Sequence, residues 1–182
     1  GQKVQQAADA NGITPQEQCD QTVVRFQELW KRLEITHDDF IRTTEPRHKT
    51  VVQQTLQELF DRDEIYSAEY EGWYCVGCER FFTEKDLVDG NCPECGRKVD
   101  SIVESNYFFR MSKYQDWLIQ YIEEHPGFIQ PSFRANETLG FLKNKELQDL
   151  CISRPKSRLA WGIELPFDAD FVTYVWFDAL IN

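Results

Sequence analysis

The chain has 182 residues, of which 41% are hydrophobic and 14% aromatic, so it can bury a core and is not a disordered tail. Its formal net charge of −11 argues against a free-standing nucleic-acid-binding protein, because such proteins usually carry a basic face. The sequence shows neither an apolar run of about eighteen residues nor a signal-peptide pattern, so we expect a cytoplasmic protein with no membrane contact.

The N-terminal part predicts two helices. The first runs from Gln2 to Ala10 and stops at Asn11-Gly12, a typical helix end. The second runs from Thr14 to Leu33, where Thr14 and Glu17 form a capping box. Its apolar residues recur every three or four positions, which predicts one buried face made of Cys19, Val23, Phe26, Trp30 and Leu33.

A short strand and a third helix are expected next. Asp39–Thr44 is β-prone and reads as a buried strand. The helix begins near Pro46 and turns four apolar side chains inward, namely Val52, Leu56, Leu59 and Phe60. His48 lies in the first turn of this helix, where a lone histidine is more often structural or solvated than catalytic.

The strongest chemical pattern consists of two CxxC pairs separated by thirteen residues: Cys75, Cys78, Cys92 and Cys95. Four thiolates that converge at about 2.3 Å from one ion favour zinc in a closed, structural site. A rubredoxin-like iron site is an alternative, because Cys-Pro-x-Cys-Gly also suits such a knuckle. A redox-active CxxC is less favoured, because two pairs in one small unit suggest a shared ion.

The segment around these cysteines predicts a small module that depends on its metal. Ile65–Tyr74 is β-prone and leads into the first CxxC, and Asn106–Phe109 returns as an apolar segment. The unit from about Ile65 to Glu104 has too few apolar residues for a core of its own, so the ion would have to stabilise it.

The C-terminal part predicts helices followed by strands. Ser112 and Gln115 form a second capping box, and Asn136 begins a helix that runs to Leu147. Cys151–Arg154 reads as a short strand, and Phe171–Phe177 as a strand covered on both faces, as in parallel sheets. We therefore expect an α/β domain that carries an insertion.

Seven stretches, in this order, resemble the bacterial methionyl-tRNA synthetases, a family of class I aminoacyl-tRNA synthetases, and together they extend over nearly the whole chain. They are Phe40–His48, Gly72–Glu79, Cys92–Arg97, Asn106–Arg110, Ile152–Arg158, Trp161–Ile163 and Tyr174–Ala179. The resemblance implies a partial Rossmann-type nucleotide-binding fold, interrupted by a connective peptide with a zinc knuckle. Residues 1–64 would end the first half of the catalytic domain, 65–104 would form the insert, and 105–182 would begin the second half.

The resemblance also implies an activity: methionine is activated with ATP, assisted by magnesium, and then transferred to tRNA. Trp176 would flank the thioether of methionine with Ala179 beside it, and Tyr174 and Asp178 lie in the same segment. Arg154 corresponds to an arginine near the methionine site, although a structural ion pair at a strand end is an equal alternative.

The chain departs from parts of the family pattern. Some members have tryptophan where Leu150 stands and proline where Leu180 stands, and some use histidine where Cys95 would bind the metal. Both phosphate-binding signatures of class I enzymes, His-Ile-Gly-His and Lys-Met-Ser-Lys-Ser, are missing from the 182 residues, so we assign no catalytic residue.

Two other functions compete with the synthetase fragment: a zinc-knuckle module that binds nucleic acid or protein, and a rubredoxin-like electron carrier. Exposed edges of an incomplete sheet would also favour self-association.

The missing signatures generate a first prediction. A polypeptide of only these 182 residues should show no methionine-dependent ATP–pyrophosphate exchange, because it lacks the groups that stabilise the transferring phosphate oxygens. Radiolabelled pyrophosphate exchange measures this directly. A rate that depends on methionine and on the chain would contradict the prediction.

Overall fold

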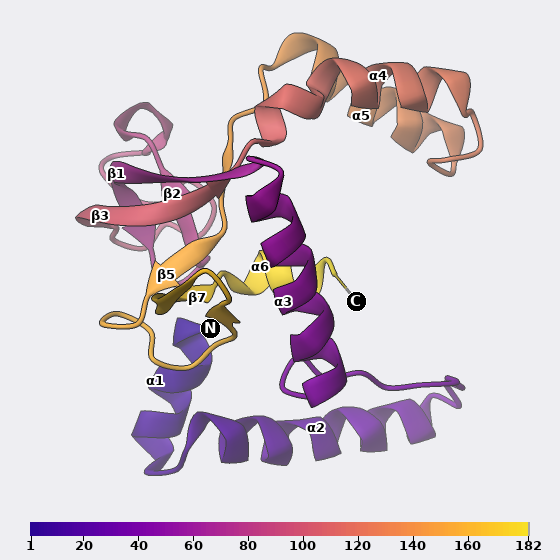
Figure 1. The fold of residues 1–182 in the computed structure, drawn as a ribbon. Coiled ribbons are helices and arrows are strands. Elements are labelled where there is room, and N and C mark those ends of the chain that lie inside the picture. Colours follow the sequence, from indigo (N-terminus) through magenta and orange to yellow (C-terminus); the bar gives the residue numbers. More distant parts are fainter. Residues whose placement is uncertain (182) are drawn as a thin grey trace.

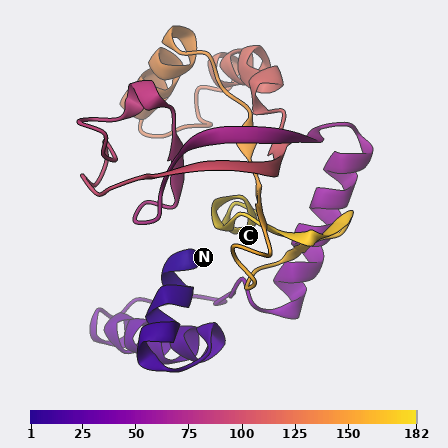
Figure 2. The same cartoon turned by 90° about the vertical axis from the view of Figure 1, so that its left-hand side faces the viewer.

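The structure, a computed structural model, describes residues 1–181, apart from the side chain of Tyr70. Helices α1 (Gln2–Asn11) and α2 (Pro15–Arg32) form one end of the molecule (Figures 1 and 2). A hairpin of α4 (Gln115–Glu124) and α5 (Ser132–Asn144) forms the opposite end, and the strands and α3 (Pro46–Asp61) lie between. Among the helices described, none is long and apolar enough to cross a membrane.

Two antiparallel sheets occupy the middle of the molecule. The four-stranded sheet has the order β2 (Arg80–Phe82), β1 (Ile65–Cys75), β3 (Asp100–Phe109) and β4 (Leu150–Cys151). The three-stranded sheet has the order β5 (Ser153–Pro155), β7 (Asp168–Thr173) and β6 (Glu164–Leu165). β1 and β3 pair from Ile65↔Phe109 to Tyr74↔Asp100, which confirms the strands expected on both sides of the cysteines.

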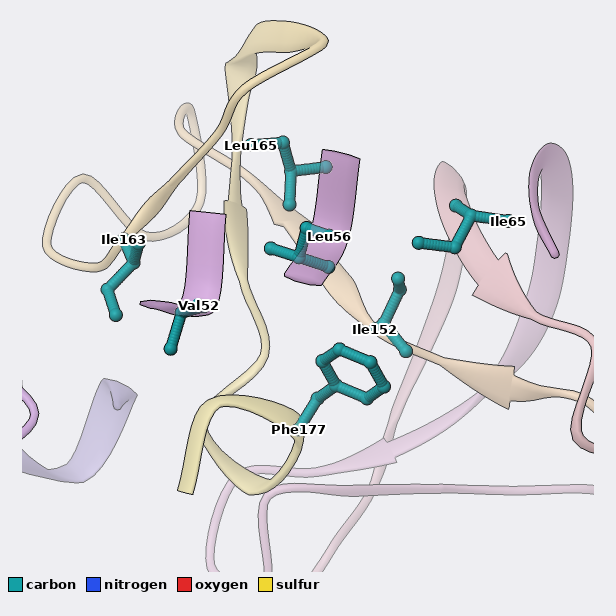
Figure 3. Close-up of a cluster of buried hydrophobic side chains, with 7 residues drawn as sticks. All are labelled: Val52, Leu56, Ile65, Ile152, Ile163, Leu165 and Phe177. Atoms are coloured by element: carbon teal, nitrogen blue, oxygen red, sulfur yellow. The ribbon is translucent and has the colours of Figure 1, made fainter. Parts of the chain in front are cut away.

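The main core joins α3 to both sheets. Val52 and Leu56 of α3 are fully buried and pack against Phe177 of the short helix α6 (Val175–Ala179), as Figure 3 shows. Ile65, Ile152, Ile163 and Leu165 complete the cluster. These contacts confirm Val52 and Leu56 of the inward face predicted for α3, and Leu59 is half-buried against the cluster. The prediction is wrong for Phe60, which is 37% exposed and stacks on Phe167.

The first two helices end and begin as predicted. Gly12 ends α1 with a φ of 66°, a left-handed conformation that glycine adopts without strain. The Thr14 Oγ1 atom accepts a hydrogen bond from the backbone N–H of Glu17 at 3.2 Å, and the Glu17 carboxylate accepts one from the N–H of Thr14 at 2.8 Å. The predicted capping box is therefore confirmed.

The prediction that the apolar stripe of α2 is buried is wrong for the described chain. No residue of α2 is buried, and Phe26 and Leu33 are 51% and 60% exposed. Of the five stripe residues, only Cys19, Val23 and Trp30 are half-buried. Amphipathic periodicity shows which side of a helix is apolar, but what covers that side depends on the rest of the fold.

The strand predicted at Asp39–Thr44 is also wrong. This segment is an irregular connection that belongs to neither sheet. Phe40 packs edge-on against Trp30, with ring centroids 5.2 Å apart, and Asp39 forms an ion pair with Arg47. A β-prone segment needs a neighbouring strand to pair with, and the described residues supply none here.

The single strand predicted at Phe171–Phe177 divides into two elements. β7 ends at Thr173, and α6 begins at Val175, after Tyr174 donates its backbone N–H to the carbonyl of Ile152 at 2.7 Å. β7 pairs antiparallel with both neighbours, so the parallel arrangement expected for this run is wrong as well. Packing of Phe177 into the core overrides the β propensity of the sequence.

The predicted start of α4 and the predicted bounds of α5, Asn136 to Leu147, are wrong. Ser112 lies in the short 3₁₀ helix η2 (Met111–Tyr114), and its hydroxyl donates to Asp149 at 2.6 Å instead of capping α4. The Gln115 amide binds the carbonyls of Leu142 and Lys145. α5 begins at Ser132, four residues before Asn136. Long-range hydrogen bonds therefore replace the local cap.

Candidate functional site

The four cysteines meet at the end of the β1–β2 hairpin. Their sulfur atoms lie within 4.8 Å of one another, with 3.4 Å between Cys75 and Cys95 and 3.8 Å between Cys78 and Cys92. A tetrahedral ion with four sulfur ligands at about 2.3 Å requires sulfur–sulfur distances of about 3.8 Å. The donor set therefore fits a tetrahedral metal ion.

The thiol electrostatics favour a bound cation. Hydrogen bonding with Cys95 raises the pKa of Cys78 to about 12, and burial raises the pKa of Cys75. The backbone N–H of Arg97 lowers the pKa of Cys95 to about 7. Thiolates at Cys75 and Cys78 are thus disfavoured without a cation, and a divalent ion would offset the charge of four thiolates.

Local contacts hold the two cysteine pairs together. Arg80 forms an ion pair with Glu94, which connects the first CxxC to the second. Gly96 has a φ of 70° and donates its N–H to the carbonyl of Cys92 at 2.9 Å, closing the second turn. Cys75, Phe82 and Cys92 form a small buried cluster of their own.

Arg154 is buried without a carboxylate partner. Its side chain comes from β5 and only 3% of the residue is exposed. Its guanidinium lies 4.2 Å from the ring centroid of Tyr174. The Nη1 atom donates to the carbonyl of Ser153 at 2.6 Å and contacts the sulfur of Cys151 at 3.2 Å, whereas Nε has no partner. The ion pair considered for Arg154 is absent among the described residues.

Trp176 and Ala179 share one side of α6. They are three residues apart, which places them on the same helical face. Trp176 is 58% exposed and Ala179 is half-buried, while Phe177 between them points into the core (Figure 3). The structure therefore presents the two predicted methionine contacts together, on a different side of α6 from Phe177.

Asp178 faces His48 across the interface of α6 and α3. The Oδ1 atom of Asp178 lies 3.9 Å from Nε2 of His48, and neither atom has a hydrogen-bond partner. Both residues are buried. Burial raises the pKa of Asp178 to about 6. The structure thus makes His48 a buried residue beside the candidate site, consistent with the structural alternative considered for it.

Unpartnered buried polar atoms gather around α6. Six buried side-chain atoms of the described residues have no hydrogen-bond partner: His48 Nε2, Glu64 Oε2, Arg154 Nε, Thr173 Oγ1, Tyr174 OH and Asp178 Oδ1. All except Glu64 belong to α6, to the two residues before it, or to side chains that face these residues. Such atoms are rare in folded proteins, so their clustering marks this region.

An open groove lies beside the same residues. It has a volume of about 820 Å³ and runs between the metal-binding hairpin and the α5–β4 connection. Arg154 and Tyr174 line it together with Tyr66, Phe81, Phe141 and Lys145. Trp176 and Ala179 do not line this groove, so the predicted residues divide between two surfaces of the α6 region.

Sequence reasoning missed Tyr74 and Phe81 as neighbours of Arg154. Their ring centroids lie 5.3 Å and 4.7 Å from its guanidinium. Tyr74 directly precedes the first cysteine pair, and Phe81 follows the turn after it. If this segment is assumed to be a hairpin, the sequence alone predicts that the two aromatic residues lie opposite each other. The pairing Tyr74↔Phe81 places both rings side by side.

Sequence comparison gives one consistent result. The model of the family "tRNA synthetases class I (M)" matches residues 1–104 and 98–182. The methionine–tRNA ligases of Clostridium acetobutylicum and Clostridium perfringens are each 52% identical to the chain over 182 residues. These matches cover the whole chain but only 28% of the length of each relative.

Structural comparison agrees with the sequence. The methionyl-tRNA synthetase of Mycobacterium tuberculosis, solved in complex with methionyl-adenylate, superposes with a TM-score of 0.90 at 39% identity. The match covers all of this chain and 36% of that protein. Neither the binding-module nor the electron-carrier alternative is favoured by these findings. The chain belongs to the class I methionyl-tRNA synthetases.

Proposed function

We propose that this chain supplies the metal-binding insert and part of the methionine pocket of a methionine–tRNA ligase. The complete enzyme would activate methionine with ATP and magnesium and then transfer it to tRNA. The relatives that match the whole chain carry this name, and one related structure contains methionyl-adenylate. The chain spans 28% of the relatives' length, so other parts of the enzyme would supply the catalytic signatures.

The clustering of unpartnered polar atoms around α6 is the observation that carries this proposal. An unsatisfied buried donor or acceptor costs about 1–3 kcal/mol. Five such atoms in one region are a substantial cost unless a ligand or a neighbouring segment supplies their partners. Methionine and its adenylate offer an ammonium group, a carboxylate and a phosphate, which match a mixed set of donors and acceptors.

Each predicted residue has a proposed role. Trp176 flanks the thioether with its aromatic face, a favourable contact for sulfur, and Ala179 leaves room beside it. Arg154 is a buried cation with no acid partner among the described residues, so it suits an anionic group of the substrate. The unpartnered hydroxyl of Tyr174 lies beside it, and Asp178, whose Oδ1 atom also lacks a partner, would offer a further oxygen to the substrate.

We propose a structural zinc ion for Cys75, Cys78, Cys92 and Cys95. The ion would cross-link the two turns and leave no open position for substrate. In this organisation, residues 1–64 end the first half of a Rossmann-type domain, 65–104 form the insert and 105–182 begin the second half. The continuous β1–β3 pairing supports an insert anchored at both of its ends. Self-association would involve β2 and β4, the outer strands of the larger sheet.

The cysteine geometry predicts the effect of removing one ligand. Cys92→Ala should lower the zinc content from about one ion per chain to nearly none and unfold the insert, because three thiolates rarely retain a structural ion. Metal analysis and circular dichroism measure both effects, and the helical signal of α2 should persist. Cys19→Ala, outside the cluster, is the control and should keep its zinc. Unchanged zinc and an unchanged spectrum in Cys92→Ala would contradict the assignment.

The position of Trp176 predicts a specific kinetic effect in the full-length synthetase. Trp176→Ala should raise the KM for methionine about tenfold, equivalent to about 1.4 kcal/mol of lost binding. Steady-state ATP–pyrophosphate exchange measures it. Trp117→Ala is a matched control, because Trp117 of α4 is 57% exposed, close to the 58% of Trp176. An equal effect of both substitutions, or none of either, would argue against a methionine pocket at α6.

The buried carboxyl of Asp178 predicts a pH-dependent stability. Its pKa is raised to about 6 in the folded chain, so the folded state holds a proton that the unfolded state has already lost. Between pH 4 and 7 the parent chain should lose about 1–3 kcal/mol of stability relative to Asp178→Asn, at about 1.4 kcal/mol per pKa unit. Urea unfolding at several pH values measures this difference. The exposed Asp38→Asn variant should follow the parent, and parallel curves for parent and Asp178→Asn would refute the shift.

A further inference from the structure

Three aromatic rings enclose the guanidinium of Arg154. The ring centroids of Tyr74, Phe81 and Tyr174 lie 5.3, 4.7 and 4.2 Å from its central carbon. Tyr74 and Tyr174 are buried and Phe81 is half-buried. A cation that is removed from water gains more from such ring faces than an exposed one does. We call this set of three rings the arginine cage.

Few polar contacts hold the guanidinium group of Arg154. Its Nη1 atom donates to the carbonyl of Ser153 and contacts the sulfur of Cys151, both close to Arg154 in sequence. The Tyr74 side chain is a further hydrogen-bond partner of Arg154. Nε has no partner, and Arg154 forms no ion pair with a described carboxylate. The lateral position of the guanidinium therefore depends on the three side chains of the arginine cage, through their rings and through the hydroxyl of Tyr74.

Two of these rings belong to the metal-binding hairpin. Tyr74 and Phe81 are cross-strand partners of β1 and β2, and the next pair, Cys75↔Arg80, closes the hairpin. Cys75 and Cys78 lie between the two rings in sequence, so the ligands of the ion and the walls of the cage share one short segment. A short length of backbone therefore connects the positions of the two rings to those of the cysteines.

A second arginine, Arg158, contacts the Tyr74 ring of the arginine cage. The guanidinium of Arg158 lies 4.1 Å from the ring centroid of Tyr74, and its Nη1 atom is 3.2 Å from a carboxylate oxygen of Glu104 on β3. Tyr74 is thus in contact with two guanidinium groups, Arg154 and Arg158. This arrangement leaves the Tyr74 ring little freedom as long as the hairpin keeps its shape.

We propose that Tyr74 and Phe81 are positioning residues that hold Arg154 for substrate, and that metal bound by the four cysteines maintains this position. The proposal rests on the substrate role proposed for Arg154 and on the zinc site proposed above. Tyr74 and Phe81 themselves touch the guanidinium, and contact with methionine or ATP is not required of them. The knuckle would then be a structural support of the substrate site as well as of the insert.

The test follows the Nε–H group of Arg154 by NMR in the ¹⁵N-labelled, zinc-loaded chain, with its signal identified by Arg154→Lys. Tyr74→Leu should move this signal and raise the hydrogen-exchange rate of the Nε–H group at least about tenfold, because a wall of its enclosure is lost. Tyr74→Phe retains the ring and loses only the hydroxyl that bonds Arg154, so it should restore most of the parent signal and of its slow exchange. Phe81→Leu is a second, independent variant that removes one ring of the arginine cage.

Two controls separate positioning from general damage. Tyr66→Leu removes another tyrosine of β1, whose ring lies 4.5 Å from Arg110, and should leave the Arg154 signal unchanged. Zinc content measured on every variant shows whether the ion is retained. Removal of zinc from the parent by a chelator should reproduce the Tyr74→Leu effect, and adding zinc back should reverse it.

Activity distinguishes this inference from the proposed function. In the full-length synthetase, Tyr74→Leu should lower kcat for methionine-dependent exchange about tenfold, and Tyr74→Phe should restore it. If Tyr74→Leu and zinc removal both leave the Arg154 signal unchanged, the positioning role is wrong. If the signal moves while kcat and KM stay at the parent values, positioning holds and the substrate role of Arg154 is wrong.

Discussion

The antiparallel pairing of β1 with β3 is the constraint on which the rest of the structure depends. One end of this pair, Ile65↔Phe109, packs beside the main core, and the other, Tyr74↔Asp100, leads into the cysteine cluster. β3 also directs the following chain, because the carbonyl of Tyr107 accepts the N–H of Ile152 at 2.9 Å and its N–H binds the Ser153 hydroxyl at 2.8 Å. Arg154 is therefore placed by the same strand that positions the metal-binding hairpin.

Local signals in the sequence predicted local structure well. The capping box at Thr14 and the helix end at Gly12 depend on residues within one or two turns, and the structure confirms both, as it confirms Val52 and Leu56 on the inward face of α3. Cysteine spacing was equally informative, because four thiols with this spacing can converge only if the chain folds back. The stripe of α2 and the run at Phe171–Phe177 failed, because burial and strand pairing depend on distant partners that periodicity does not identify.

The candidate site was only partly visible in the sequence for a related reason. Arg154 and the residues of α6 were found through a family resemblance, whereas the roles of His48 and Tyr74 follow from contacts across more than seventy residues of chain. A lone histidine or a tyrosine beside a cysteine carries no distinctive pattern. The role of such a residue becomes visible only when folding excludes water around it and leaves a charge or a hydrogen-bond donor without a partner.

Asp149 shows how one carboxylate can fix the shape of a large opening. It accepts hydrogen bonds from the Tyr66 hydroxyl of β1 at 2.9 Å and from both the N–H and the hydroxyl of Ser112, directly before α4. Although burial opposes it, these bonds from Ser112 and Tyr66 lower the pKa of Asp149 below its usual value. The carboxylate thus stays charged in mildly acidic solution, where Asp178 gains its proton. The bonds of Asp149 that join the start of the helical hairpin to the sheet are therefore retained at a pH at which the buried carboxyl between α6 and α3 becomes protonated.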